Sequence, residues 1–123
     1  MEQSINEIEL NGVKYIPKHL ASDNLKNTEG MPYVLVRTYS AGVHIGYLKE
    51  QNGKEVTLLN SRNIWYWSGA AGVSQLATDG VSNPDGCKFT VEVPERILTE
   101  AIEILPVTEK AFANLTSVPV WKK

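Results

Sequence analysis

The chain has 123 residues, of which 42% are hydrophobic and 21% charged, and its net charge is −2. These values are typical of one globular domain, and they exclude broad electrostatic binding to nucleic acid or to an anionic membrane surface, which both need a large basic excess. A single cysteine, Cys87, excludes an intrachain disulfide and favours a reducing cytoplasm. No apolar run approaches the ~20 residues of a membrane span, and the polar N-terminus does not resemble a secretory signal.

The N-terminal residues predict a small β-hairpin. The stretch INEIELNGVKYI (residues 5–16) alternates apolar and polar residues on both sides of an Asn-Gly pair, which tolerates the positive φ of a hairpin turn. Pro17 ends the second strand, and residues 18–31 are polar without a sustained period. We therefore expect a hairpin extension at 1–17, a linker at 18–31 and the main domain at 32–123.

The main domain opens with four predicted strands joined by short connections. Residues rich in β-branched and aromatic side chains, separated by turn signals, define these strands. They cover Tyr33–Tyr39, Val43–Lys49, Glu55–Asn60 and Asn63–Trp67. Because every connection is short, an antiparallel meander is the simplest topology.

The second half of the domain predicts helices and one more strand. Val73–Thr78 has helical spacing, and Lys88–Val93 alternates as a strand. The stretch PERILTEAIEIL (residues 94–105) favours a helix, although its alternation could instead extend a strand. Thr108 is a plausible N-cap for a last helix that ends near Leu115. The predicted fold is α+β: an antiparallel meander of four to five strands packed against two or three short helices, with an N-terminal hairpin.

The stretch WYWSGAAG (residues 65–72) is the most distinctive in the chain. On a strand, Trp65 and Trp67 would point to one face and Tyr66 to the other. Such rings can stack on a nucleobase, each stack contributing ~1–3 kcal/mol. Alternatively, the two tryptophans cover the sheet where a helix docks, each burying ~150–250 Å². Core packing is favoured, and a ligand-facing role for at least one ring stays open.

Two arginines and a run of small residues are further candidates for a binding site. Arg37 lies inside an apolar strand, where its charge needs a wet face or a partner. Its guanidinium suits a phosphate, and a salt bridge to an acidic residue is the alternative. Arg62 lies three residues before Trp65. The small residues from Ser68 could expose backbone N–H groups to an anion, or simply let the chain cross closely over the tryptophans.

The remaining reactive side chains predict neither metal binding nor catalysis. His19 and His44 are far apart and no cluster has metal-ligand spacing, so we expect no metal and no cofactor. His44 lies in an alternating strand and is expected to face solvent. The surroundings of Cys87 are typical of a small buried hydrophobe, and no serine lies in a nucleophile elbow. We therefore predict that the protein is not an enzyme.

Several uncommon strings occur in order along the chain. They are RTYSAGVHIGYLKEQNGKEVTLLNSRNIWYWSGAAGVSQLA, CKF, LTEAIEILPVTEKA and VPVWK. With them the chain resembles a family of small proteins of unknown function that tailed bacteriophages and prophages encode, from about Tyr33 to Lys122. Typical members start close to Met31. The resemblance implies a phage origin and the cytoplasm of the bacterial host, but no known activity and no assigned site.

The first functional hypothesis is a non-enzymatic phage protein that sequesters a small nucleotide-like immune signal. Some phage accessory proteins sequester cyclic ADP-ribose variants or cyclic oligonucleotides in this way, and such an anti-defence protein needs rings for a base and cations for phosphates. Sites of this kind commonly form between subunits, so a homo-oligomer is expected. The residues predicted to bind the ligand are Arg37, Thr38, Tyr39, Ser40, Gly42, Arg62, Trp65, Tyr66, Trp67, Ser68 and Gly69.

The alternative hypothesis is a protein–protein interaction module. It would be an inhibitor of a host factor or a small structural or morphogenesis protein, with exposed sheet edges and the N-terminal hairpin as contact surfaces. We expect no membrane partner and no nucleic-acid partner, because the acidic balance of the chain opposes both.

Overall fold

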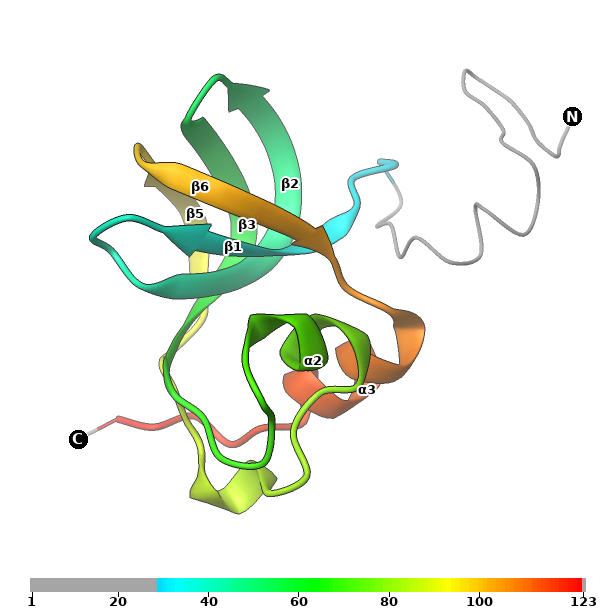
Figure 1. Ribbon diagram of the computed structural model, residues 1–123. Coiled ribbons are helices and arrows are strands. Elements are labelled where there is room, and N and C mark those ends of the chain that lie inside the picture. Colours follow the sequence, from blue (N-terminus) through cyan, green and yellow to red (C-terminus); the bar gives the residue numbers. More distant parts are fainter. Residues whose placement is uncertain (1–28, 123) are drawn as a thin grey trace, which may run out of the picture.

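The computed structural model describes residues 29–122 (Figure 1). The predicted hairpin at 1–17 and all but the end of the predicted linker lie outside the described residues. The elements, in chain order, are β1 (Tyr33–Thr38), β2 (Val43–Asn52), β3 (Glu55–Tyr66), α2 (Val73–Thr78), the 3₁₀ turn η1 (Pro84–Gly86), β4 (Lys88–Phe89), β5 (Val93–Leu98), β6 (Ala101–Pro106) and α3 (Glu109–Thr116).

The strands form one antiparallel sheet that curls back on itself. Its order is β4-β3-β2-β1-β6, and β5 pairs with β3 beside β4. Two residues, Thr99 and Glu100, join β5 to β6, so the two outer strands meet at one end and the sheet curves into an open barrel (Figure 1). The Ala101 N–H donates to the Lys54 carbonyl at 3.0 Å, which ties the start of β6 to the β2–β3 turn.

Two separate hydrophobic cores lie on the two faces of this curved sheet. The barrel interior contains Val34, Val36, Val56, Leu58, Leu98 and Ala101. The second core lies between the outer face of the sheet and the helices, and includes Tyr33, Leu35, Ile45, Ile64, Leu76, Phe89, Val107, Ala111 and Leu115. Because successive strand residues point to opposite faces, β1 supplies both cores, and its residues 33–36 are an unbroken apolar run.

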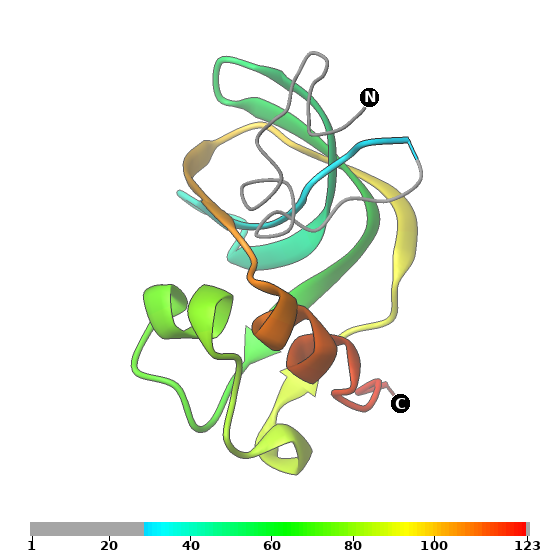
Figure 2. The ribbon, with the colours of Figure 1, turned by 90° about the vertical axis from the view of Figure 1, so that its right-hand side faces the viewer.

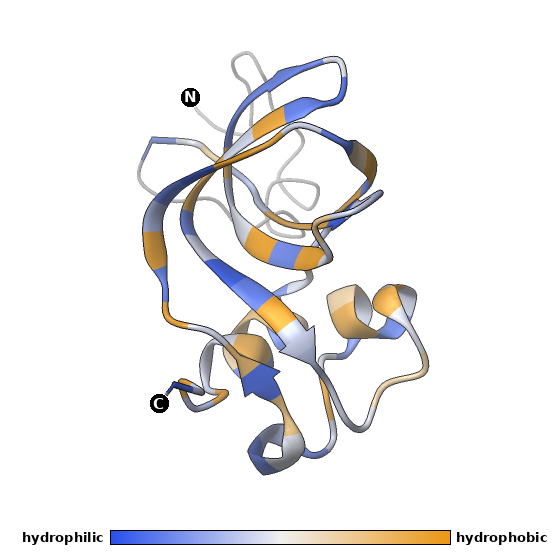
Figure 3. Ribbon diagram, turned by 90° about the vertical axis from the view of Figure 1, so that its left-hand side faces the viewer, coloured by the Kyte–Doolittle hydropathy of each residue, from blue (hydrophilic) through white to orange (hydrophobic). Residues whose placement is uncertain are grey.

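The two helices pack side by side against the sheet (Figure 2). Thr108 caps α3 as predicted, since its Oγ1 accepts from the Ala111 N–H at 3.0 Å. The same hydroxyl donates to the Thr78 carbonyl at the end of α2, at 2.6 Å. Figure 3 shows apolar and polar bands alternating along parts of the strands. Neither helix in residues 29–122 has the length and apolar character that a membrane crossing needs.

The α+β class is confirmed, but four predictions about its elements are wrong. One is the strand predicted at Lys88–Val93, of which only Lys88–Phe89 forms β4, while Val93 begins β5. The sheet has six strands instead of four to five, and the predicted strands at 55–60 and 63–67 are one continuous β3. Asn60 has a φ of 51°, and the pairing of β3 with β2 shifts register there, from Ile45↔Arg62 to Tyr47↔Leu59. A β-bulge within β3 therefore lies between the two predicted strands. The helix predicted at 94–105 is the pair of strands β5 and β6.

The error at 94–105 has a tertiary cause. β5 completes its hydrogen bonds on β3 and β6 on β1, and these partners are distant in sequence. The apolar residues that suggested one helical face are divided between inside and outside. Leu98 and Ala101 are buried in the barrel, whereas Ile97 and Ile102 are about half exposed. Strand pairing therefore overrides a periodicity that fits a helix equally well.

Candidate functional site

The predicted site residues fall into two groups in the structure. The first lies at the end of β1 and in the β1–β2 loop, and the second at the end of β3 and in the chain that follows it. Gly42 of the loop lies beside Asn63 of β3, so the two groups are neighbours in the sheet. Within residues 29–122, however, no hydrogen bond or ring contact joins the two groups, so the structure does not bring them together into one site.

The β1–β2 loop is a turn closed by its own side chains. Thr38 Oγ1 donates to the Gly42 carbonyl and accepts from the Ala41 N–H, both at 2.8 Å. Ser40 Oγ donates to a carboxylate oxygen of Glu100 on the β5–β6 turn. Tyr39, by contrast, is 79% exposed. The loop therefore presents the Tyr39 ring to solvent, while the Ala41 N–H already has a partner in Thr38.

Arg37 takes the alternative role that the sequence left open. It lies opposite Glu103 in the β1–β6 ladder, and its Nε donates to Glu103 Oε1 at 2.8 Å. Both side chains are more than a third exposed, so this ion pair contributes little to stability.

Arg62 is buried and bonds to the backbone instead of to a carboxylate. Its Nε, Nη1 and Nη2 donate to four carbonyl oxygens at 3.0–3.3 Å, two in and after β4 and two in the C-terminal tail. These carbonyls belong to Phe89, Thr90, Val118 and Pro119. Burial lowers the pKa of Arg62. Because its donors are used inside the protein, we assign Arg62 a positioning role and not the phosphate contact that the sequence suggested.

The C-terminal tail is the segment that Arg62 positions. Val120 bridges to Phe89 in a parallel sense, and the Trp121 N–H donates to the Phe89 carbonyl at 2.8 Å. Together with the Arg62 bonds to the two preceding carbonyls, these contacts hold the tail along β4. The tail thereby places Trp121 next to the end of β3.

Trp65, Lys88 and Trp121 form a surface cluster, with Lys88 partly buried, that we name the indole platform. The Trp65 and Trp121 rings are stacked, with centroids 4.9 Å apart and planes 23° apart. The Lys88 ammonium lies 5.3 Å from the Trp65 ring centroid and 5.4 Å from that of Trp121, which is within cation–π distance of both. Trp65 is 60% exposed. Tyr66, opposite Lys88 in the ladder, is also exposed.

The strand pattern predicted that Trp65 and Trp67 point to the same face of the sheet. In the structure they do not, and a β-bulge explains the difference. The pairing with β4 passes from Ile64↔Phe89 to Tyr66↔Lys88, so Trp65 is an extra residue on β3. The bulge interrupts the alternation of faces. Trp67 accordingly packs against the core beneath the helices, while Trp65 faces solvent. Trp67 therefore fits the core-packing interpretation, and Trp65 has the exposure that a ligand-facing role would need.

The small residues after Trp67 serve close packing. The Gly69 carbonyl accepts from the Ser82 N–H at 3.0 Å, and a Cβ at Gly69 would lie 2.4 Å from Ser82 Oγ. The Ser68 N–H points at the sulfur of Cys87, at 3.3 Å. The predicted backbone donor at Ser68 thus already faces a partner in the buried cysteine.

His44 is buried, whereas the sequence predicted that it faces solvent. Its Nε2 lies 2.8 Å from the Ala41 carbonyl, and Asn63 Nδ2 is 3.4 Å from the ring. Burial lowers the pKa of His44 to about 4, and the nearby Arg96 guanidinium acts in the same direction. The alternation that led to the wrong prediction could not show that the β1–β2 loop folds over the ring.

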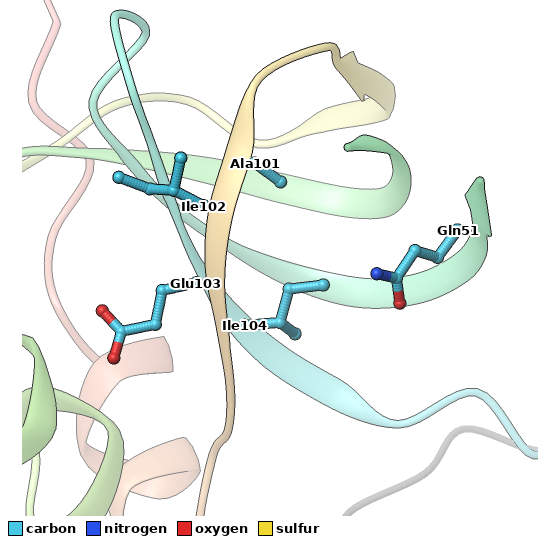
Figure 4. Close-up of a pocket in the computed structure, with 5 residues that line it drawn as sticks. All are labelled: Gln51, Ala101, Ile102, Glu103 and Ile104. Carbon is cyan, nitrogen blue, oxygen red and sulfur yellow. The ribbon is translucent and has the colours of Figure 1, made fainter. Parts of the chain in front are cut away.

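Two shallow hollows lie away from the indole platform. One, of about 330 Å³, lies between β6 and Gln51 of β2, and Figure 4 shows Ile104 pointing across it while Ile102 and Glu103 point away. The other, of about 370 Å³, lies between α2 and α3 and includes Gly69, Asp79 and Lys110. Asp79 and Lys110 face each other at 3.4 Å, so their charges already have partners.

The predicted site residues include neither Lys88 nor Trp121. A lysine in a two-residue strand carries no signal of its own, because its position over the rings depends on the distant tail. In residues 29–122 no three His, Cys, Asp or Glu side chains gather as metal ligands.

A family model described as a domain of unknown function (DUF6948) matches residues 31–115, which include the whole sheet and nearly all of α3. No curated protein and no solved structure matches the chain.

Proposed function

The chain belongs to this family of unknown function, DUF6948, and from its own residues we propose that it is a non-enzymatic domain that binds another protein through the indole platform. One observation carries the proposal: two stacked tryptophans and a lysine gather on the surface, where Trp65 is 60% exposed. Exposed clusters of large apolar side chains mark interaction sites, and tryptophan and tyrosine dominate the binding energy of protein interfaces.

The shape of the platform favours a protein over a small molecule as its partner. Small-molecule sites are concave and cover most of the ligand surface. Neither of the two hollows described above is lined by a platform residue. A protein partner can instead cover the platform from outside, with Trp65 as an anchor and the polar surroundings as a rim.

Capture of a nucleotide-like signal is the second candidate, because Tyr39, Trp65 and Tyr66 are exposed and could each stack on a base. This candidate is weakened because both arginines predicted to bind phosphates already have partners. The Arg62 donors bind backbone carbonyls, and Arg37 is paired with Glu103. Such capture would require a second subunit to close the site, which fits the expected homo-oligomer. In either case we propose the setting implied by the resemblance, a phage protein in the bacterial cytoplasm with an anti-defence or morphogenesis role.

One purified protein can test both candidates. The wild-type chain, Trp65→Ala and the control Ile102→Ser are immobilised and exposed to lysate of a bacterial host. We expect a stoichiometric protein that wild type and Ile102→Ser retain and that Trp65→Ala loses. In parallel, each protein is incubated with a panel of cyclic nucleotides, washed and boiled, and the released ligand is identified by mass spectrometry. A retained nucleotide without a protein partner would replace the first candidate with the second.

A further inference from the structure

We infer that the partner segment of the indole platform is acidic: an extended peptide in which a carboxylate side chain lies close to an apolar or aromatic one. The carboxylate would pair with Lys88, and the apolar side chain would lie on Trp65. This inference rests on the proposed function and specifies the chemistry of its partner.

The argument begins with the unpaired charge of Lys88. Its ammonium is held over two indole rings, and no carboxylate lies within 4 Å of it in the part of the chain that the structure describes. Lys49 and Lys110, in contrast, face Glu95 and Asp79 at 3.8 and 3.4 Å. The rings orient the cation without neutralising it, so it remains available to an anion from a partner.

Exposed apolar residues lie close to this lysine along the chain and in the tail. Val120 is 50% exposed in the tail that carries Trp121, and Val91 is 44% exposed just after β4. The tail residue Val120 pairs with Phe89, the neighbour of Lys88, so apolar surface and cation lie within a few residues of each other. A partner that supplied an apolar side chain alone would leave the ammonium desolvated and unpaired, which is costly. Charge complementarity therefore requires an acid beside the apolar group.

A carboxylate fits this site better than a phosphate. Phosphate groups carry close to two charges and are typically bound by several donors, with arginine in bidentate geometry. The platform contains one ammonium group. Of the two arginines predicted to bind phosphate, Arg62 donates to backbone carbonyls and Arg37 to Glu103. A single lysine on a rigid aromatic support matches one carboxylate.

Selection from a random peptide library displayed against the full chain tests the inference, because it presumes no sequence. Wild type and the control Ile102→Ser should enrich peptides with Asp or Glu within two residues of an aromatic or aliphatic residue. Trp65→Ala should enrich none of them. Lys88→Glu should lower the affinity for a synthetic copy of the best peptide at least about 10-fold, equivalent to ~1.4 kcal/mol, and should select basic peptides instead.

The outcomes separate this inference from the function on which it depends. Enrichment that requires Trp65 but shows no acidic preference, or that Lys88→Glu leaves unchanged, overturns the acidic partner while the protein-binding function stands. Enrichment that Trp65→Ala retains, or no enrichment at all, overturns both. The exciton couplet of the stacked indoles in far-UV circular dichroism, retained in Lys88→Glu, excludes a folding defect as the reason for a change in selection.

Discussion

At the β4 end of the molecule, Trp65 and Trp121 are stacked in solvent beside an unpaired lysine, whereas at the barrel end Ile97 and Ile102 are exposed singly. Ile102 is the extra residue of a bulge, since the pairing with β1 skips from Glu103 to Ala101, and Pro106 ends the strand without a donor. Bulges, prolines and charges on an edge strand are devices against further pairing. Large apolar side chains are thus exposed in both regions. At the β4 end they form one cluster, whereas at the barrel end they lie singly beside an edge that is protected against further pairing.

The two regions also use arginine in opposite ways. At the barrel end, Arg37 forms a surface ion pair with Glu103. At the platform end, Arg62 is 6% exposed and connects β4 to the tail through backbone carbonyls. The comparison teaches that the exposed surface depends in part on a buried charge beneath it, because Arg62 binds the Val118 and Pro119 carbonyls and so adds to the Trp121 N–H bond that holds the tail on Phe89.

Replacement of Arg62 should have the largest effect. Arg62→Met leaves carbonyls of the tail and β4 without their donor, so the free energy of unfolding should fall by about 3 kcal/mol. Arg37→Met is the matched control and should cost less than ~1 kcal/mol. Urea denaturation measures both, and circular dichroism should show loss of the indole couplet in Arg62→Met alone. Equal losses for the two variants would contradict the contrast between the arginines.

Acid should weaken the region around the β1–β2 loop through His44. The folded state holds the pKa of His44 at about 4, below its ordinary value of 6.5, so folding favours the neutral ring. Stability is therefore full above pH 6.5 and falls as the pH drops toward 4, at up to ~1.4 kcal/mol per unit and about 2 kcal/mol by pH 5. The groups facing the ring are the Ala41 carbonyl, Asn63 and Arg96.

His44→Gln provides the control for this prediction. Urea titrations of both proteins between pH 7 and 5 measure their free energies of unfolding. Because the two proteins share every other titrating group, the difference between their pH dependences is due to His44. Parallel loss of stability in the two proteins would show that His44 does not carry the pH dependence.

Gly80 lies in a crowded position at the helical end, whereas Gly53 lies in an open turn at the barrel end. Gly80 and Gly53 both have positive φ, 84° and 59°. A Cβ at Gly80 would lie 2.2 Å from Asn114 Oδ1, which accepts from the Val81 N–H, whereas nothing lies within 4 Å of a Cβ at Gly53. Gly80→Ala should therefore destabilise by about 1–2 kcal/mol more than Gly53→Ala. Thermal unfolding of both variants measures this difference, and equal shifts would contradict the crowding at Asn114.

Trp65→Ala should have the smallest effect on stability, but it should remove the ring stacking of the indole platform. Its ring is largely exposed, so the loss of stacking on Trp121 should cost about 1 kcal/mol or less. The far-UV couplet should disappear, while the urea midpoint should stay close to that of Ile102→Ser. A large loss of stability would mean that Trp65 is a core residue, and it would contradict the role of the indole platform as a binding surface.

Local patterns predicted the elements whose partners are near in sequence. The short connection before Glu55, the cap at Thr108 and the short helix from Val73 all depend on residues close together in the chain, and the structure contains each of them. The candidate site was predicted in part. Trp65 and Tyr66 are exposed as a ligand-facing role requires, whereas the arginines have internal or ion-pair roles.

What the sequence determined by itself was the domain class, the apolar β1 and the placement of aromatic residues near position 65, because composition and nearest-neighbour preferences are properties of the chain alone. Only the tertiary structure decided that 94–105 forms strands, that a bulge turns Trp65 outward, and that Arg62 holds the tail so that Trp121 meets it. These features join segments 22 or more residues apart, and hydrogen bonds over such separations leave no periodic trace in the sequence.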